Sequence, residues 1–162
     1  KYPNGKYGNN RDFIEYLFLN KIAIDQARKF AENYSSHNEN DHWSAYLMAL
    51  SYASKNDVEG GARYYDLWIN KHSPMIDNGW PLFFYVIYAA LYKTRIDKAI
   101  DYANIIENGS CDKVEIRINL AKLLHEKGEN KKAILKLNEV NPFINNLEEK
   151  KEVDYLIKEY ST

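Results

Sequence analysis

Four alanines recur along this chain at nearly equal intervals, and their periodicity constrains the fold more than any other feature. They are Ala27, Ala62, Ala99 and Ala133, so the spacings are 35, 37 and 34 residues. Each alanine stands near the start of a segment with apolar residues at helical spacing. Such a period accommodates two helices and two short turns, and neither helix can bury its apolar stripe alone. Because alanine is small, it lets the second helix approach the first closely. The periodicity predicts helix pairs that stack on one another.

Hydrophobic periodicity predicts helices throughout the chain and no strand. Apolar residues recur three and four positions apart, whereas no segment sustains the alternation of a half-buried strand. Asp41 is suited to cap the third helix, and Gly128 to make the turn before the eighth. The longest apolar run, residues 80–92, is shorter than the roughly 20 residues of a membrane-spanning helix, so we expect a buried helix and no membrane insertion. The predicted helices cover residues 11–20, 25–34, 41–54, 57–71, 80–93, 96–107, 112–127, 130–140 and 147–160.

The fourth repeat carries the clearest sequence motif. Residues 120–134 read LAKLLHEKGENKKAI, with a leucine and a small residue in the first helix and a glycine before the second. This pattern resembles the tetratricopeptide repeat, which has a 34-residue period. In the earlier repeats, Ile22, Asp57 and Thr94 align with the position of Gly128.

The resemblance implies an all-α fold, an α-solenoid of about four helix–turn–helix repeats with a C-terminal capping helix. We expect a loose head over residues 1–10 and a single repeat domain over residues 11–160. The repeats would cover residues 11–37, 41–74, 79–109 and 112–142, and the capping helix residues 147–160. A capping helix needs only one apolar face, because it covers only one side of the stack.

Charge is balanced along the chain. The formal net charge is -1, with 12 Lys+Arg and 13 Asp+Glu before Cys111 and 10 of each after it. Neither half has the positive excess that binding a phosphate backbone requires, so nucleic acid is not an expected partner. Cys111 is the one cysteine, which excludes an intramolecular disulfide and a four-cysteine zinc site. We expect it to be partly buried. The compartment stays open, with a soluble cytoplasmic protein favoured.

No catalytic or metal-binding motif is present in the sequence. His37 and His42 are five residues apart, the wrong spacing for two metal ligands on one helical face. The sequence also lacks the motifs of nucleophile elbows, zinc proteases, P-loops and dinucleotide-binding folds. We therefore expect this chain to have no metal, no cofactor and no enzymatic activity.

The predicted binding surface is the concave face, which the first helices of the repeats line in the tetratricopeptide family. In the third repeat, Phe84, Tyr88 and Tyr92 are expected to form an aromatic floor on this face. The alternative is that these aromatic residues pack against neighbouring helices. For the polar members of the surface, the alternative is simple solvation. The full predicted set is Tyr16, Asn20, Ser51, Lys55, Phe84, Tyr88, Tyr92, Lys122 and His125.

Three hypotheses for function follow. The first is a non-enzymatic scaffold that binds a peptide or protein segment on the concave face. The second is a helical accessory or oligomerisation domain of a larger enzyme, such as a glycosyltransferase or another polymer-modifying enzyme, because the chain begins at Lys1 rather than Met. The third is self-assembly into a homo-oligomer through the terminal helices.

Overall fold

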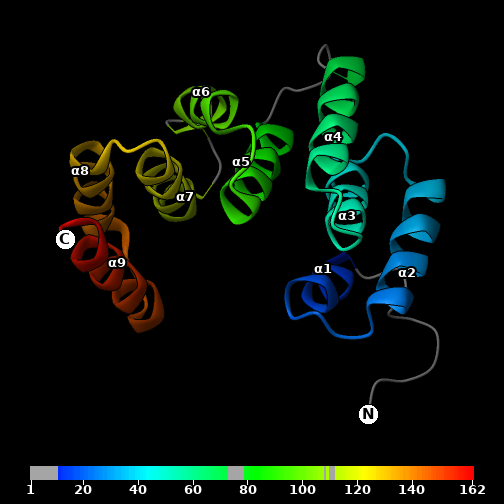
Figure 1. Ribbon diagram of the computed structural model, residues 1–162, viewed down its shortest axis with the longest axis horizontal. Helices are drawn as coiled ribbons and strands as arrows, with labels where there is room; N and C mark the ends of the chain where they lie inside the picture. Colours follow the sequence, from blue (N-terminus) through cyan, green and yellow to red (C-terminus); the bar gives the residue numbers. More distant parts are fainter. Residues whose placement is uncertain (1–10, 73–78, 108, 110–111) are drawn as a thin grey trace. The chain divides into compact units, whose positions relative to one another are not determined.

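The computed structural model describes residues 11–72, 79–107, 109 and 112–162, and within these residues the protein contains helices and no strand (Figure 1). The predicted helices are all present, with ends that differ from the predicted ones by three residues at most. The predicted loose head and Cys111 lie outside the described residues. The helices are α1 (Arg11–Leu19), α2 (Ile24–His37), α3 (His42–Ala53), α4 (Val58–His72), α5 (Trp80–Tyr92), α6 (Ile96–Ile106), α7 (Lys113–Glu126), α8 (Asn130–Val140), the short 3-10 helix η2 (Asn141–Phe143) and α9 (Leu147–Tyr160).

The chain divides into two compact units between residues 76 and 77. In the first unit, α1 packs on α2 and α3, α2 packs on α3, and α3 packs on α4. In the second unit, α5 packs on α6 and α7, α6 on α7, α7 on α8, and α8 on α9. Each unit therefore holds two of the predicted helix pairs. The single domain over residues 11–160 stays a prediction.

The four recurring alanines lie at the centre of these pairs. Ala27, Ala62, Ala99 and Ala133 are all 0% exposed, on α2, α4, α6 and α8. A larger side chain at these positions would push the paired helices apart, because protein interiors are close-packed. The expected role of the alanines is therefore confirmed.

The turns between paired helices share one backbone geometry. In each turn an amide donates a hydrogen bond five residues back: Ile22 to Leu17, Asp57 to Tyr52, Thr94 to Ala89 and Glu129 to Leu124. The residue before each donor has a positive φ, 55° at Lys21, 62° at Asn56, 53° at Lys93 and 83° at Gly128. This combination is the Schellman motif, which satisfies the last carbonyls of the first helix.

The common motif corrects the predicted alignment of the turns. The left-handed positions equivalent to Gly128 are Lys21, Asn56 and Lys93, whereas Ile22, Asp57 and Thr94 correspond to Glu129. The donor of the turn lies five residues before the recurring alanine in the first three repeats and four residues before it in the fourth. An alignment on the alanines therefore displaces the position of Gly128 by one residue.

Side-chain caps fix the starts of α3 and α7, each the first helix of its pair. The carboxylate of Asp41 accepts a hydrogen bond from the amide of Trp43 (3.2 Å), which confirms the predicted cap of α3. Asp112 accepts from the amides of Val114 and Glu115 at the start of α7 (2.9 and 3.1 Å). These contacts satisfy amides that have no partner within the helix.

Candidate functional site

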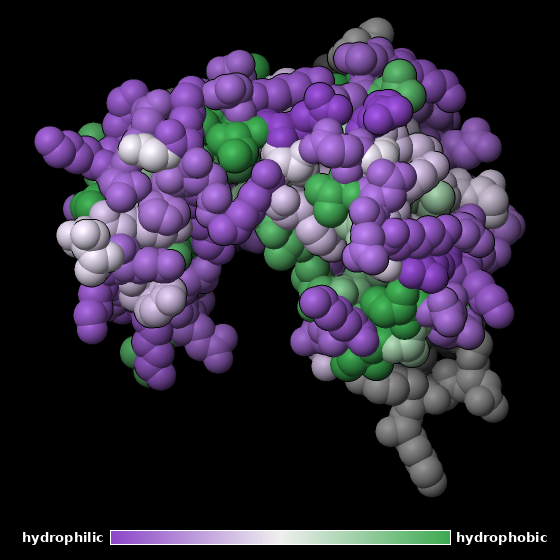
Figure 2. All heavy atoms as spheres, viewed as in Figure 1, coloured by the Kyte–Doolittle hydropathy of each residue, from purple (hydrophilic) through white to green (hydrophobic). Residues whose placement is uncertain are grey.

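The surface is mainly hydrophilic on the face shown in Figure 2, in keeping with a mean hydropathy of -0.61. A concave site with apolar side chains lies within the first unit, between α2 and α4 with α3 at its base. Its volume is about 510 Å³, within the range of roughly 300–1,000 Å³ typical of ligand pockets. We call this site the α2–α4 groove. Its lining residues are Glu32, Ser35, Ser36, Glu39, Met48, Tyr64, Leu67, Trp68, Lys71 and His72.

The two walls of the groove have different chemistry. The α2 wall is polar and consists of Glu32, Ser35 and Ser36 of α2 together with Glu39 of the segment after it. The α4 wall is largely apolar, and its Leu67 side chain is 65% exposed. Met48 from α3 is half-buried at the base. Exposed apolar area in a depression, beside charged groups, is typical of a surface that binds another molecule.

Hydrogen bonds and ring stacking fix the α4 wall. The indole Nε1 of Trp68 donates to the carbonyl of Glu39 (2.9 Å), and the indole ring stacks on the His72 ring with centroids 4.2 Å apart. The His72 ring is 4% exposed and also bonds to the Trp68 carbonyl and the Asn40 side chain. These contacts tie α4 to the segment between α2 and α3, so Trp68 presents a rigid surface.

Contacts between α2 and α3 fix the other wall. The Ser44 hydroxyl donates to the Ser35 hydroxyl (2.7 Å), and Arg28 donates to the Ser54 hydroxyl and carbonyl (3.0 and 2.9 Å). The Tyr34 hydroxyl donates to Asp41. Burial and the bond to Asp41 raise the pKa of Tyr34 to about 12, so this hydroxyl keeps its proton at neutral pH. The groove is therefore formed before any partner binds.

The charged groups on the rim are available to a partner. Glu32, Glu39 and Lys71 are exposed, and their side chains make no ion pair within the described part of the chain. Glu32 lies on α2, Glu39 lies in the segment between α2 and α3, and Lys71 lies on α4. The rim is thus acidic on one side and basic on the other.

The predicted residues of the first unit lie on another surface. Tyr16 is 53% exposed on α1, and Asn20 and Lys55 are exposed at the ends of α1 and α3. The side-chain amide of Asn20 donates a hydrogen bond to the Tyr16 carbonyl (2.9 Å), a contact at the end of α1. Ser51 is 2% exposed, so its predicted accessibility is wrong. The extensive contacts of α3 with α1, α2 and α4 account for this burial.

The predicted aromatic floor of the second unit is largely buried. Phe84 and Tyr88 are 6% and 1% exposed, so their expected position on an open surface is wrong and the packing alternative describes them. Phe84 lies edge-on to Phe83, with centroids 5.3 Å apart, and Tyr88 lies 4.8 Å from the Tyr92 ring. The α5 helix is apolar nearly all round, which is the composition of a buried helix. Tyr92 is half-buried, and burial raises its pKa.

Lys122 and His125 connect α7 to the C-terminal helix. The Lys122 amine lies 2.8 Å from the Glu152 carboxylate, and the His125 ring stacks on Tyr160 at 3.9 Å. Burial and nearby carboxylates raise the pKa of Tyr160 to about 12. Both predicted residues thus have structural contacts with α9, in keeping with its role as a cap. Their predicted role in binding a partner stays a prediction.

One feature of the α4 sequence indicates the groove, although the predicted site did not include it. On α4, the core stripe of Ala62, Tyr65 and Ile69 is buried, but Leu67 lies outside that stripe. Trp68 is half-buried beside the groove. The α2 wall offers no such indication, since glutamates and serines are typical of a solvated face.

No group of three or more His, Cys, Asp or Glu side chains that fits a metal ion occurs among the described residues. None of the helices in the described ranges is long and apolar enough to cross a membrane. The residues that line the α2–α4 groove offer hydrophobic contact, ion pairing and hydrogen bonding.

Comparison with known proteins bears on the fold. No protein-family model matches the chain, and no curated protein matches it in sequence. Among solved structures, this chain is similar to the structure titled "MamA RS-1 ArsTM double mutant", with a TM-score of 0.58. The likeness covers 98% of this chain and 91% of that one at 12% sequence identity. MamA contains tetratricopeptide repeats. The fold is thus an all-α helical repeat of the tetratricopeptide-like kind.

Proposed function

We propose that this chain is a non-enzymatic protein-interaction module and that its α2–α4 groove binds a segment of a partner protein. The observation that carries the proposal is the exposed Leu67 beside the fixed Trp68 ring and the half-buried Met48. Leu67 lies outside the buried stripe of α4, so its exposed area is available for an intermolecular contact. Burying a leucine side chain contributes about 1.5–3 kcal/mol.

The absence of catalytic motifs in the sequence motivates the non-enzymatic part of the proposal. Helical repeats commonly serve as extended binding surfaces, because each repeat adds area without requiring a central catalytic cavity. As an accessory domain of a larger enzyme, the chain would use the same groove to bind or position its partner. The concave-face hypothesis places the partner instead on the first helices of the repeats, where Tyr16, Asn20 and Lys55 are exposed in the first unit.

Site-specific photo-crosslinking tests the location of binding. We would place benzoylphenylalanine at Leu67 in the groove, at Tyr16 on α1, and at Arg63, which is exposed on α4 but does not line the groove. The chain would be irradiated in cells of its source and the adducts identified by mass spectrometry. The proposal predicts a specific adduct from Leu67 and none from Arg63. An adduct from Tyr16 alone would favour the concave-face hypothesis, and no adduct from any position would contradict binding at either surface.

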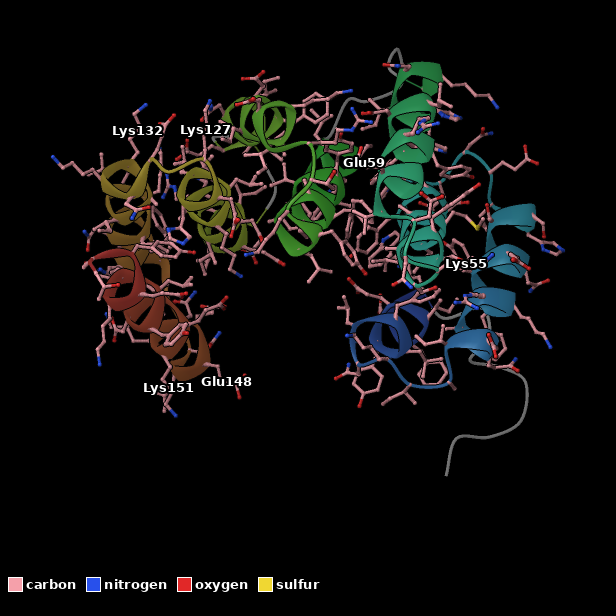
Figure 3. All side chains as sticks on the ribbon, in the orientation of Figure 1. Lys55, Glu59, Lys127, Lys132, Glu148 and Lys151 are labelled. Carbon is pink, nitrogen blue, oxygen red and sulfur yellow. The ribbon has the colours of Figure 1, made fainter. Side chains whose placement is uncertain are left out.

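Self-association through α9 is a second candidate function. Leu147 and Tyr155 are 67% and 64% exposed on this helix, opposite the buried Val153 and Leu156. Figure 3 shows Glu148 and Lys151 projecting from the start of α9. Sedimentation equilibrium over a concentration series tests this candidate. A rise in mass that Tyr155→Lys abolishes would support self-association, whereas a constant monomer mass would exclude it.

A further inference from the structure

The shape of the α2–α4 groove indicates which backbone conformation it accepts. The lining positions are 32, 35 and 36 on α2, 39 in the segment after α2, and 64, 67, 68 and 71 on α4. The α4 positions have the spacing i, i+3, i+4, i+7, which is the set of four side chains that surrounds a knob in helix–helix packing, and the α2 positions have the spacing i, i+3, i+4. The α4 stripe spans about 10.5 Å, or two helical turns. These two stripes with Met48 between them match the side-chain period of a third helix.

An extended segment fits this groove less well than a helix. Strand addition needs a row of free backbone amides and carbonyls, and the walls here are helices whose backbone groups are bonded within each helix. A helix satisfies its own backbone groups, so it needs only side-chain contacts from the walls. Leu67, Trp68 and Met48 supply an apolar surface for this purpose, and methionine adapts its shape to different apolar partners.

The rim charges indicate the chemistry of the flanks of the bound helix. Glu32 on α2 and Glu39 in the segment after it place two carboxylates on one wall, so this wall attracts basic residues on a bound helix. Lys71 on the opposite wall repels a basic flank and attracts an acidic one. The two flanks of the occupant are therefore distinguished by charge.

From these observations we infer that the occupant is an amphipathic helix of a partner protein. Its apolar stripe lies on Leu67, its basic flank faces α2, and an acidic residue faces Lys71. This inference rests on the proposed function and names the partner class of the same site. Because the rim groups are exposed, charge recognition weakens as the salt concentration rises.

Designed peptides test the inference against the full chain. Three fluorescent 18-residue peptides would share one leucine stripe. The first has lysines on one flank and a glutamate on the other, the second has glutamates on both flanks, and the third is the first with a central proline. Fluorescence anisotropy at low salt should show the first peptide binding about tenfold more tightly than the second, from two exposed ion pairs changed to repulsion. The proline peptide should bind at least tenfold more weakly, because proline breaks the helix.

Variants of the chain locate the bound peptide. Leu67→Asp should weaken binding of the first peptide about tenfold or more, since it removes the apolar anchor from an exposed position that the fold does not need. The pair Glu32→Lys and Glu39→Lys should reverse the preference between the first two peptides. A matched control, Glu59→Lys with Glu148→Lys, changes the net charge equally at exposed positions outside the groove and should keep the preference.

Equal binding of the three peptides, a preference unchanged by the groove variants, or no binding of any peptide would overturn the inference. The crosslinking experiment then separates this failure from that of the proposed function. A specific adduct from Leu67 would leave the groove as a binding site for a segment of another kind. No adduct from Leu67 would contradict the groove itself.

Discussion

Replacement of Glu107 by glutamine tests how the second unit is held together. Glu107 directly follows α6. Its carboxylate accepts hydrogen bonds from Arg117 Nε of α7 (3.1 Å) and Lys136 Nζ of α8 (2.8 Å). The three side chains are only 11%, 13% and 24% exposed. One carboxylate therefore joins three helices, and glutamine removes its charge while keeping its size.

The expected cost is about 2 kcal/mol of unfolding free energy. Hydrogen bonds to charged groups contribute about 1.5–3 kcal/mol each, and the glutamine carbonyl retains part of one bond. Neither cation loses every partner, because Arg117 also bonds to the Glu139 carbonyl (3.3 Å) and Lys136 to the Glu139 carboxylate (3.1 Å). The cost therefore falls below the roughly 3–5 kcal/mol of breaking a fully buried pair.

The effect depends on pH in a defined direction. Burial raises the pKa of Glu107, but hydrogen bonds and positive charge from Lys136 and Arg117 outweigh burial, so the net pKa lies below its usual 4.5. A lowered carboxyl pKa stabilises the folded state above the unfolded-state pKa, and this contribution is lost as pH falls through the folded-state pKa. The difference between wild type and Glu107→Gln should be constant near neutral pH and shrink below about pH 4.5.

Urea denaturation, with hydrogen exchange at the amides of α7, measures the change. Asp154→Asn is the matched control, because its ion pair with Lys150 is exposed on both sides (45% and 58%) and should contribute less than about 0.5 kcal/mol. If Glu107→Gln cost no more than Asp154→Asn, the network would not stabilise the unit. A difference that persisted unchanged at pH 3 would refute the electrostatic explanation.

Four further changes have defined outcomes. Gly128→Ala should destabilise the protein by about 1 kcal/mol in urea denaturation, because its φ of 83° is unfavourable for a residue with a Cβ; a neutral result would contradict this. Lys21→Gly, at a φ of 55°, should stabilise it by about 0.5–1 kcal/mol in the same assay. Ala133→Leu should cost about 1–3 kcal/mol through overpacking, since this alanine is 0% exposed, and an unchanged midpoint would contradict close packing. Burial lowers the pKa of His42; the charge of Arg11 also lowers it, and that of Asp41 opposes the shift. The stability of the folded state should therefore fall as the pH drops below 6.5. Thermal denaturation of His42→Gln should show a smaller loss of stability between about pH 7 and 5.

The helices were predictable because periodic burial leaves a strong mark on the sequence. Each repeat hides one alanine and an aliphatic or aromatic stripe, so Ala27 and Ala99 mark equivalent helices despite little other identity. The turns were less predictable, since backbone hydrogen bonds define them and their left-handed residues include Lys21 and Lys93. A glycine marks the turn clearly only at Gly128.

The candidate site was predictable only in part. Phe84 and Tyr88 were expected on a surface, but an apolar helix in contact with two others has little surface left. The α2–α4 groove was missed because its α2 wall is made of residues such as Glu32, which are also common on solvated faces. The position of that wall beside the exposed Leu67 depends on how α2 and α4 pack on α3, and a pattern within one helix does not contain this information.

The Schellman turns have a consequence for how this fold changes during evolution. Because hydrogen bonds hold each turn, a glycine at the left-handed position can be replaced at a cost of about 1 kcal/mol, which the core of a repeat can absorb. Lys21, Asn56 and Lys93 occupy that position in three of the four turns. A lineage can therefore lose the glycines one substitution at a time while the helix pairs persist. The likeness in fold at 12% identity, where no family model matches the sequence, is in keeping with turns that do not depend on a glycine.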